Sequence, residues 1–146
     1  MTSWPHALTR RAILAFSVLC AIPLPARADA ALHGRWLAEA IGGRGVVDRI
    51  QTVLEIAPDG RVSGSGGCNR IFGAVRIDGQ ALAFSQMGST KMACESAVMI
   101  QEQQFLAALA NVRRWRIDGS SRKLILSDAA GAELVVLARR GRQPSD

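Results

Sequence analysis

The chain has 146 residues, with 18 Lys+Arg against 12 Asp+Glu, no tyrosine and two histidines. Only His33 lies beyond the N-terminal segment described next, so the chain offers too few ligands for a zinc site of ordinary type. A Ser-His-Asp or Cys-His catalytic arrangement would have to recruit this same residue from near one end. Neither GxGxxG nor GxxxxGK followed by Ser or Thr occurs, so the common nucleotide-binding loops are excluded. We therefore expect no enzyme, no metal and no cofactor.

Residues 1–28 have the pattern of a cleaved secretory signal. Arg10 and Arg11 are followed by an apolar run over 12–22, and Ala26-Arg27-Ala28 supplies the small residues of a cleavage site. The run is too short to span a bilayer, and no later stretch approaches the ~20 apolar residues that a membrane helix needs. The arginine pair also resembles a twin-arginine signal, so both export routes stay open. We expect a periplasmic or secreted protein that begins near Asp29.

Cleavage would leave 118 residues, enough for one domain with a single core. These residues retain 15 of the basic side chains and all 12 acidic ones, so the net charge falls to +3. Much of this surplus lies in 139–146, which we predict to be a basic, disordered tail after a domain over 29–138. Such a tail could touch anionic lipid or nucleic acid, but a solvated tail is the favoured interpretation, and no nucleic-acid partner is expected.

Turn signals separate short apolar runs along the mature chain. Asp-Gly pairs, which favour hairpins, occur at 59–60, 78–79 and 118–119, and a further turn signal occupies 128–131. The runs beside these turns alternate in polarity, and 134–137 has the composition of a buried closing strand. The pattern predicts about seven or eight short strands in an antiparallel sheet or small barrel.

The segment 95–112 differs because it contains neither Gly nor Pro and has a helical apolar stripe of Val98, Phe105, Leu109 and Val112. The predicted fold class is therefore α+β, mainly β, with one helix. That helix should pack its stripe against one sheet face or plug one end of the barrel.

Glu102 is the exceptional residue of this helix. It lies four residues after Val98 and three before Phe105, so it points toward the apolar stripe. A half-buried carboxylate needs a partner, and Arg70 is the predicted one, in a structural ion pair. The alternative is that Glu102 lies at the edge of the stripe and reaches water.

Three glycines, Gly64, Gly66 and Gly67, precede Cys68 and Asn69, which is too many for a plain strand. One interpretation is a backbone that approaches a ligand. The favoured one is a barrel corner that turns Cys68 and Asn69 inward, with the Asn69 side chain bonded to neighbouring backbone.

The chain has three cysteines, and Cys20 lies in the predicted signal. The remaining pair, Cys68 and Cys94, predicts one disulfide in an exported protein. The alternative is a reactive pair for thiol exchange or metal capture, but there is no CxxC spacing and no histidine to activate a thiolate. A second open alternative concerns Met87, Met92 and Met99, which with Phe84 could line a cavity for a lipid, although filling an irregular core is favoured.

These motifs together resemble the META domain family, which includes the HslJ-type heat-shock-inducible proteins. The resemblance covers about 35–138 and rests on seven segments: Trp36-Leu37, Gly64-Ser65-Gly66-Gly67-Cys68-Asn69-Arg70 with Phe72-Gly73, Asp78-Gly79, Thr90-Lys91-Met92-Ala93-Cys94, Glu102 with Phe105 and Leu109, Trp115, and Leu124-Ile125-Leu126. It implies a compact antiparallel β structure with one helix, in secreted or envelope proteins linked to stress. It carries over no catalytic residue. Val75 departs from the aromatic residue that is common there, so a ligand surface built on that ring is not expected here.

The expected protein is an exported, non-enzymatic, monomeric binding or interaction module associated with envelope stress. Its partner would be a protein or a small apolar ligand of the envelope. The alternatives are a carrier of an apolar ligand and a thiol-active protein. The candidate site residues are Cys68, Cys94, Gly66, Gly67, Asn69, Arg70 and Glu102.

Overall fold

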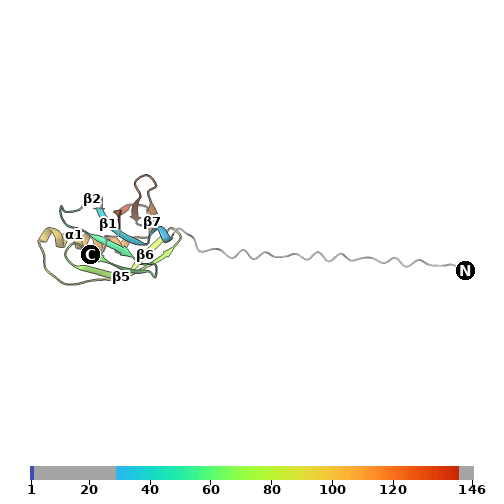
Figure 1. Ribbon diagram of the computed structural model, residues 1–146, viewed down its shortest axis with the longest axis horizontal. Helices are drawn as coiled ribbons and strands as arrows, with labels where there is room; N and C mark the ends of the chain where they lie inside the picture. The colour runs from blue at the N-terminus through green and yellow to red at the C-terminus, as the bar shows by residue number, and fades with distance from the viewer. Residues whose placement is uncertain (2–28, 142–146) are drawn as a thin grey trace.

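Nine strands and one α-helix make up the part of the chain that the computed structural model describes, Met1 and residues 29–141 (Figure 1). Most of the predicted signal and the end of the predicted tail, 2–28 and 142–146, lie outside the described residues. The elements in chain order are η1 (Asp29–Ala31), β1 (Gly34–Ile41), β2 (Arg44–Gly45), β3 (Val53–Ile56), β4 (Arg61–Ser65), β5 (Arg70–Asp78), β6 (Ala81–Ser89), α1 (Ser96–Asn111), β7 (Arg114–Ile117), β8 (Lys123–Ser127) and β9 (Glu133–Arg140).

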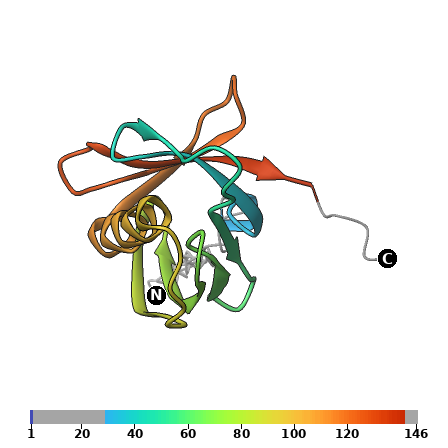
Figure 2. The ribbon, with the colours of Figure 1, turned by 90° about the vertical axis from the view of Figure 1, so that its left-hand side faces the viewer.

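The antiparallel sheet closes into a ring. Its order is β2-β1-β3-β4-β5-β6-β7-β8-β9, and β9 pairs back onto β1. The weakest junction is between β6 and β7, which share the single register pair Ala81 and Arg114. Helix α1 connects these two strands in sequence and contacts β6, β9 and β1. In Figure 2, α1 lies between the red strand β9 and the yellow-green strand β6.

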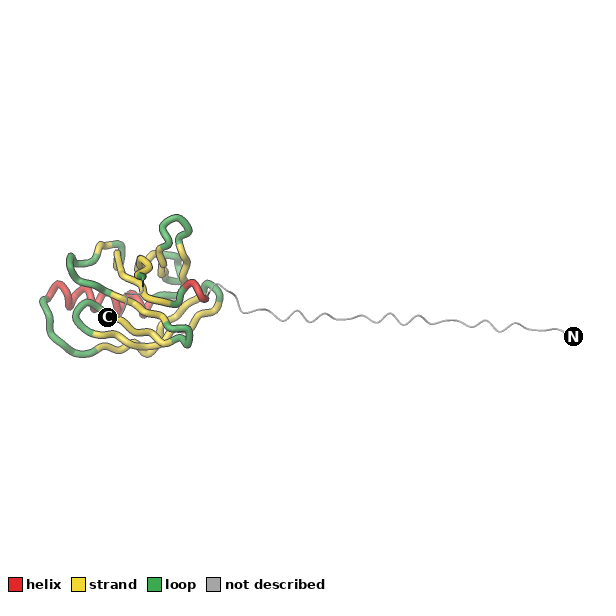
Figure 3. Tube along the Cα trace, in the orientation of Figure 1, coloured by secondary structure: helices red, strands yellow, loops and turns green. Residues whose placement is uncertain are grey.

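The predicted fold class is confirmed, with nine strands instead of seven or eight (Figure 3). The difference includes β2, which is only two residues long. The helix begins one residue later and ends one residue earlier than predicted. No helix among the described residues is long and apolar enough to cross a membrane.

The apolar stripe of α1 faces the interior of the ring, because Val98, Phe105 and Leu109 are all buried. The largest side chains that are fully buried come from both halves of the chain: Trp36, Phe105, Leu32, Leu54, Ile56, Ile71, Leu82, Leu109, Leu124, Leu126, Leu137 and Val112. Phe84 is also buried and Met87 packs against this core, whereas Met92 is 58% exposed. Two of the residues considered for an apolar cavity therefore fill the interior.

The predicted turns connect the strands as expected. Gly60 and Gly79 have positive φ angles of 83° and 57°, which glycine adopts at no steric cost. At the Asp118 turn, the side chain of Ser121 and the backbone N–H of Ser120 donate hydrogen bonds that lower the pKa of the carboxyl. These local bonds explain why aspartate recurs at the turns.

The start of the domain is fixed to its last strand. Leu32 is fully buried, and the indole Nε1 of Trp36 donates a 2.8 Å hydrogen bond to its carbonyl oxygen. The Arg139 guanidinium lies over the Trp36 ring, 4.4 Å from its centroid, and donates to the carbonyl oxygens of His33 and Ala31. The N-terminal segment is thus held from Ala31 onward.

The last strand extends two residues beyond the predicted domain end at 138. Strand β9 continues to Arg140, and its last residues pair with β1, Arg139 with Trp36 and Arg140 with Arg35. Composition suggested a disordered basic tail, but a strand partner distant in sequence orders both arginines.

Gly64 marks a close approach of two backbones. A Cβ atom at this position would lie 1.9 Å from the carbonyl oxygen of Val53 on the neighbouring strand β3. Such a contact is far inside van der Waals distance, and backbone cannot move away as a flexible side chain can. The glycine is therefore required by the packing of β3 against β4.

We predict that Gly64→Ala lowers the free energy of unfolding by about 1–3 kcal/mol, because the added methyl forces the strands apart. Gly45→Ala is the matched control, since a Cβ there meets nothing within 4 Å. Urea denaturation of both variants measures the difference. Equal stabilities would contradict the close approach.

Candidate functional site

A four-residue loop, 66–69, joins β4 to β5 and lies against α1. The Gly66 N–H donates a 2.9 Å hydrogen bond to the Asn69 carbonyl oxygen, which closes the loop. A Cβ on Gly66 would lie 2.4 Å from Cγ of Glu102, and a Cβ on Gly67 would lie 2.9 Å from Cγ2 of Ile50. Gly67 also has a φ of 120°, a conformation that side chains rarely adopt. Gly66 therefore makes room for Glu102 of the helix, and Gly67 makes room for Ile50 and for Val98 of the helix.

Glu102 fills the space that the glycines leave. Glu102 is only 4% exposed. Its Oε2 accepts hydrogen bonds from the backbone N–H groups of Cys68, at 3.2 Å, and of Asn69, at 2.6 Å. Oε1 accepts the side-chain amide Nδ2 of Asn69, also at 2.6 Å. A carboxylate held by several N–H donors is stabilised by charge-assisted hydrogen bonds without a cation.

The predicted ion pair between Glu102 and Arg70 is wrong. No salt bridge between the two residues is present, although both are among the described residues. Alternation along β5 places Arg70 on the outer face, exposed, while Ile71 is 2% exposed and faces the core. The loop amides supply the partners that the carboxylate needs, and these donors belong to the backbone.

Asn69 connects this loop to the segment between β6 and α1. It is 2% exposed, and its Oδ1 accepts the Met92 N–H at 2.6 Å and the Thr90 hydroxyl at 2.9 Å. Its Nδ2 also lies 3.3 Å from the Met92 carbonyl oxygen, to which it donates. The Asn69 amide therefore bonds the Met92 backbone and the Thr90 hydroxyl, more than 20 residues away in sequence.

The predicted disulfide joins the same two segments. Cys68 and Cys94 are bonded, with their Cα atoms 6.0 Å apart. Cys94 is exposed and Cys68 is half-buried. The loop that carries Gly66, Gly67 and Asn69 is thus held to the β6–α1 segment by a covalent bond and by the Asn69 hydrogen bonds.

Sequence reasoning missed a second polar link beside Glu102. Gln101 is 5% exposed; its Oε1 accepts the Val47 N–H at 2.6 Å and its Nε2 donates to the Thr52 hydroxyl at 3.0 Å. Thr52 in turn donates to the Gly66 carbonyl oxygen at 3.2 Å. The signal was available, because Gln101 lies three residues after Val98 and four before Phe105, the spacing logic that selected Glu102.

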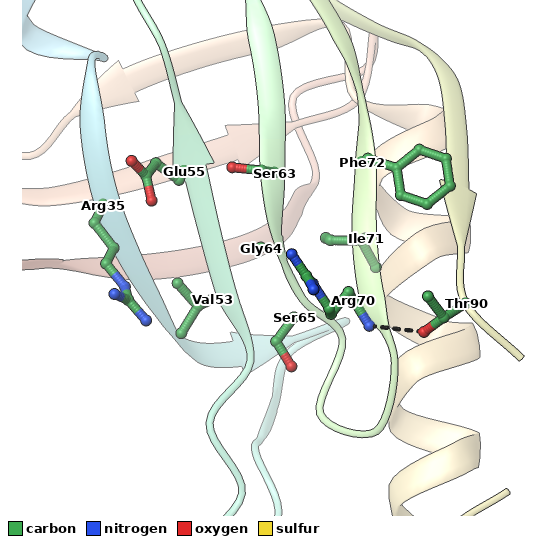
Figure 4. Close-up of a pocket in the computed structure, with 10 residues that line it drawn as sticks. All are labelled: Arg35, Val53, Glu55, Ser63, Gly64, Ser65, Arg70, Ile71, Phe72 and Thr90. Atoms are coloured by element: carbon green, nitrogen blue, oxygen red, sulfur yellow. Dashed lines mark hydrogen bonds between the residues drawn. The ribbon is translucent and has the colours of Figure 1, made fainter. Parts of the chain in front are cut away.

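A separate hollow of about 450 Å³ opens on the outer face of β1, β3, β4 and β5 (Figure 4). Its lining residues are Arg35, Val53, Glu55, Ser63, Gly64, Ser65, Arg70, Ile71, Phe72 and Thr90. Arg70 is the one predicted site residue with an exposed charge here, and its N–H donates to the Thr90 hydroxyl at 3.1 Å. Phe72 is 53% exposed. The sequence alone did not bring these residues together.

Within residues 29–141, no group of three His, Cys, Asp or Glu side chains is placed to hold a metal ion. The buried polar side chains of the Glu102 cluster are bonded to one another or to backbone. The Glu102 cluster is therefore a set of structural hydrogen bonds beside the disulfide. The hollow with its exposed charges lies on a neighbouring face of the sheet.

Fold and site together define a small closed-sheet domain in which a disulfide and a buried carboxylate join a hairpin loop to the single helix. The sequence model of the META domain matches residues 29–141. The chain therefore belongs to the META domain family, as its motifs predicted. META domains are not a known enzyme family.

Solved structures show the same fold at low sequence identity. The NMR structure of a protein from Burkholderia xenovorans is 23% identical with a TM-score of 0.64, covering 95% of this chain and all of that one. A second NMR structure is 20% identical with a TM-score of 0.56, covering 77% of this chain and 94% of the other. A DUF4847 family protein from Bacteroides vulgatus is 18% identical with a TM-score of 0.52, covering 79% and 98%. A comparison with curated proteins finds no match.

We predict that Glu102→Ala lowers the free energy of unfolding by about 3 kcal/mol or more, because it leaves buried N–H donors without an acceptor. Arg70→Ala should change it by less than about 0.5 kcal/mol, because that side chain is exposed and outside the cluster. A double-mutant cycle of Glu102→Ala with Asn69→Ala should give a coupling of about 1–3 kcal/mol. Denaturant titrations provide all of these values. If a cycle of Glu102→Ala with Arg70→Ala gave this coupling and the cycle with Asn69→Ala did not, Arg70 would be the partner of Glu102. That result would contradict the hydrogen bonds to the loop.

Proposed function

We propose that this protein is an exported, non-enzymatic binding or interaction module of the bacterial envelope, of the stress-associated kind that its family resemblance implies. One sequence feature supports export, because residues 1–28 have the pattern of a secretory signal. The buried residues Leu32 and Trp36 lie after the predicted cleavage site at Ala28, so the mature protein would keep both.

The Cys68–Cys94 disulfide is the observation that carries this proposal. A disulfide with one exposed cysteine persists in an oxidising compartment and is rare where thiols are kept reduced. It closes a loop with a sequence separation of 26, which contributes roughly 3–4 kcal/mol in the chain-entropy model. That is a large share of the stability of a small domain.

A binding role fits the site better than catalysis does. The buried Glu102 carboxylate is occupied by three N–H donors, and Asn69 and Gln101 are bonded to neighbouring segments. A general acid or base instead needs a proton-transfer group within reach of a substrate. The core filled by Phe84 and Met87 weighs against the carriage of an apolar ligand inside the ring.

We expect the protein from a cell-envelope fraction, alkylated without reduction, to have an intact mass that begins at Asp29 and carries no alkyl adduct. This result would support export, cleavage and the disulfide together. One or two adducts would mean free thiols and would revive the thiol-active alternative. A mass that includes residues 1–28 would contradict cleavage.

We also predict that Cys68→Ser and Cys94→Ser each lower the free energy of unfolding by roughly 3–4 kcal/mol. Cys20→Ser is the matched control, because that cysteine would be removed with the signal. Thermal or urea unfolding of the three exported proteins measures the effect. A Cys68→Ser variant as stable as the control would show that the disulfide is not structural.

A further inference from the structure

We propose that the outer face of β1, β3, β4 and β5 binds an extended acidic segment of a protein partner, with Arg35 and Arg70 as its anchoring cations. This inference rests on the proposed function and names the surface and the chemical class of the partner. The surface is the hollow of about 450 Å³ described above.

The two arginines approach the hollow from opposite sides. Strands β3 and β4 lie between β1 and β5, so about 14 Å of sheet separates the two backbones. Figure 4 shows the Arg35 guanidinium beside Val53 and the Arg70 guanidinium beside Gly64, both over the hollow. Two small residues on β4, Ser63 and Ser65, lie between the arginines, and their short side chains leave the hollow open. Their hydroxyl groups can bond a polar backbone laid across the sheet.

The charges of this face have no ionic partners among residues 29–141. The salt bridges there are Arg61–Asp59, Arg116–Glu133 and Lys123–Glu39. Arg35 lies directly across from Glu55 in the register of β1 and β3, which would favour a cross-strand ion pair. Its guanidinium instead points toward Val53 (Figure 4). The charges of Arg35, Arg70 and Glu55 therefore stay available to a partner.

Phe72 adds a fixed apolar surface beside Arg70. Its ring lies against Gly88 on β6, where a Cβ atom would come within 2.6 Å of the ring carbon Cε2. The glycine thus holds the ring flat on the sheet while 53% of the residue stays exposed. Arginine and aromatic side chains that are held in place before binding contribute most of the energy in protein interfaces.

The hollow contains both positive and negative side chains, and this mixture favours one class of ligand over others. Guanidinium groups pair with carboxylates or phosphates in a bidentate manner. The Glu55 carboxylate in the same hollow repels a densely charged phosphate group or anionic membrane, but tolerates carboxylates that are spaced apart. In an extended peptide, alternate side chains lie on one side about 6.7 Å apart. A segment with alternating acidic residues and an apolar residue for Phe72 matches this pattern.

The test uses fluorescence anisotropy with the mature protein and a fluorescein-labelled peptide in which Asp alternates with Val. A peptide with Asn in place of Asp is the ligand control. We expect binding of the Asp peptide only, and a loss of about tenfold or more in affinity for Arg35→Gln and for Arg70→Gln. Arg76→Gln is the matched control, because Arg76 is exposed on the same strand but does not line the hollow. Its affinity should equal that of the wild type.

Three results would overturn the inference. If Arg76→Gln and Arg70→Gln lost equal affinity for the Asp peptide, the binding would depend on the net charge of the protein and not on this hollow. Tighter binding to phosphatidylglycerol vesicles than to the Asp peptide would replace the peptide by an anionic membrane. If a protein whose mass shows cleavage and an intact disulfide bound neither probe, the proposed binding surface would be wrong. The proposed export and the disulfide would be unaffected by that result.

Discussion

The Glu102 carboxylate controls how the helix meets the sheet. It is almost completely buried and has no cation, and an isolated charge in that position would be prohibitively costly. Three N–H groups from Cys68 and Asn69 offset the cost, and they can reach the carboxylate only because Gly66 leaves space for it. Helix, loop glycines and asparagine are therefore parts of one packing arrangement, and none of them is explained alone.

The disulfide acts on the same two segments as Asn69. The side-chain amide of Asn69 bonds the Thr90 hydroxyl and the Met92 backbone. Cys94, which forms the disulfide with Cys68, lies two residues after Met92. This double attachment fixes the start of β5, the strand that presents Arg70 and Phe72 on the outer face. A rigid loop at the start of this strand suits the proposed binding role, because ordering that face on binding would cost affinity.

Local pattern predicted much of the fold and only part of the site. The helix, its buried stripe and the Asp-Gly turns followed from periodicity and turn chemistry, which depend on neighbouring residues. The burial of Glu102 followed in the same way. Its partner did not, because every residue carries a backbone N–H and a sequence does not show which amides point inward. Arg139 was assigned to a disordered tail for a related reason: its partner strand β1 lies at the other end of the domain. The outer hollow needed the registers of four strands before Arg35 and Arg70 could be placed together.

The most direct test of this account is native-state amide hydrogen exchange, followed by NMR, at Cys68 and Asn69. If Glu102 holds the loop, both amides should be protected to about the level of the core strands, although they lie in a loop, because opening them requires the helix to separate. In Glu102→Ala that protection should fall while the central strands keep theirs. Exchange at the rate of an exposed loop in the wild-type protein would contradict the account.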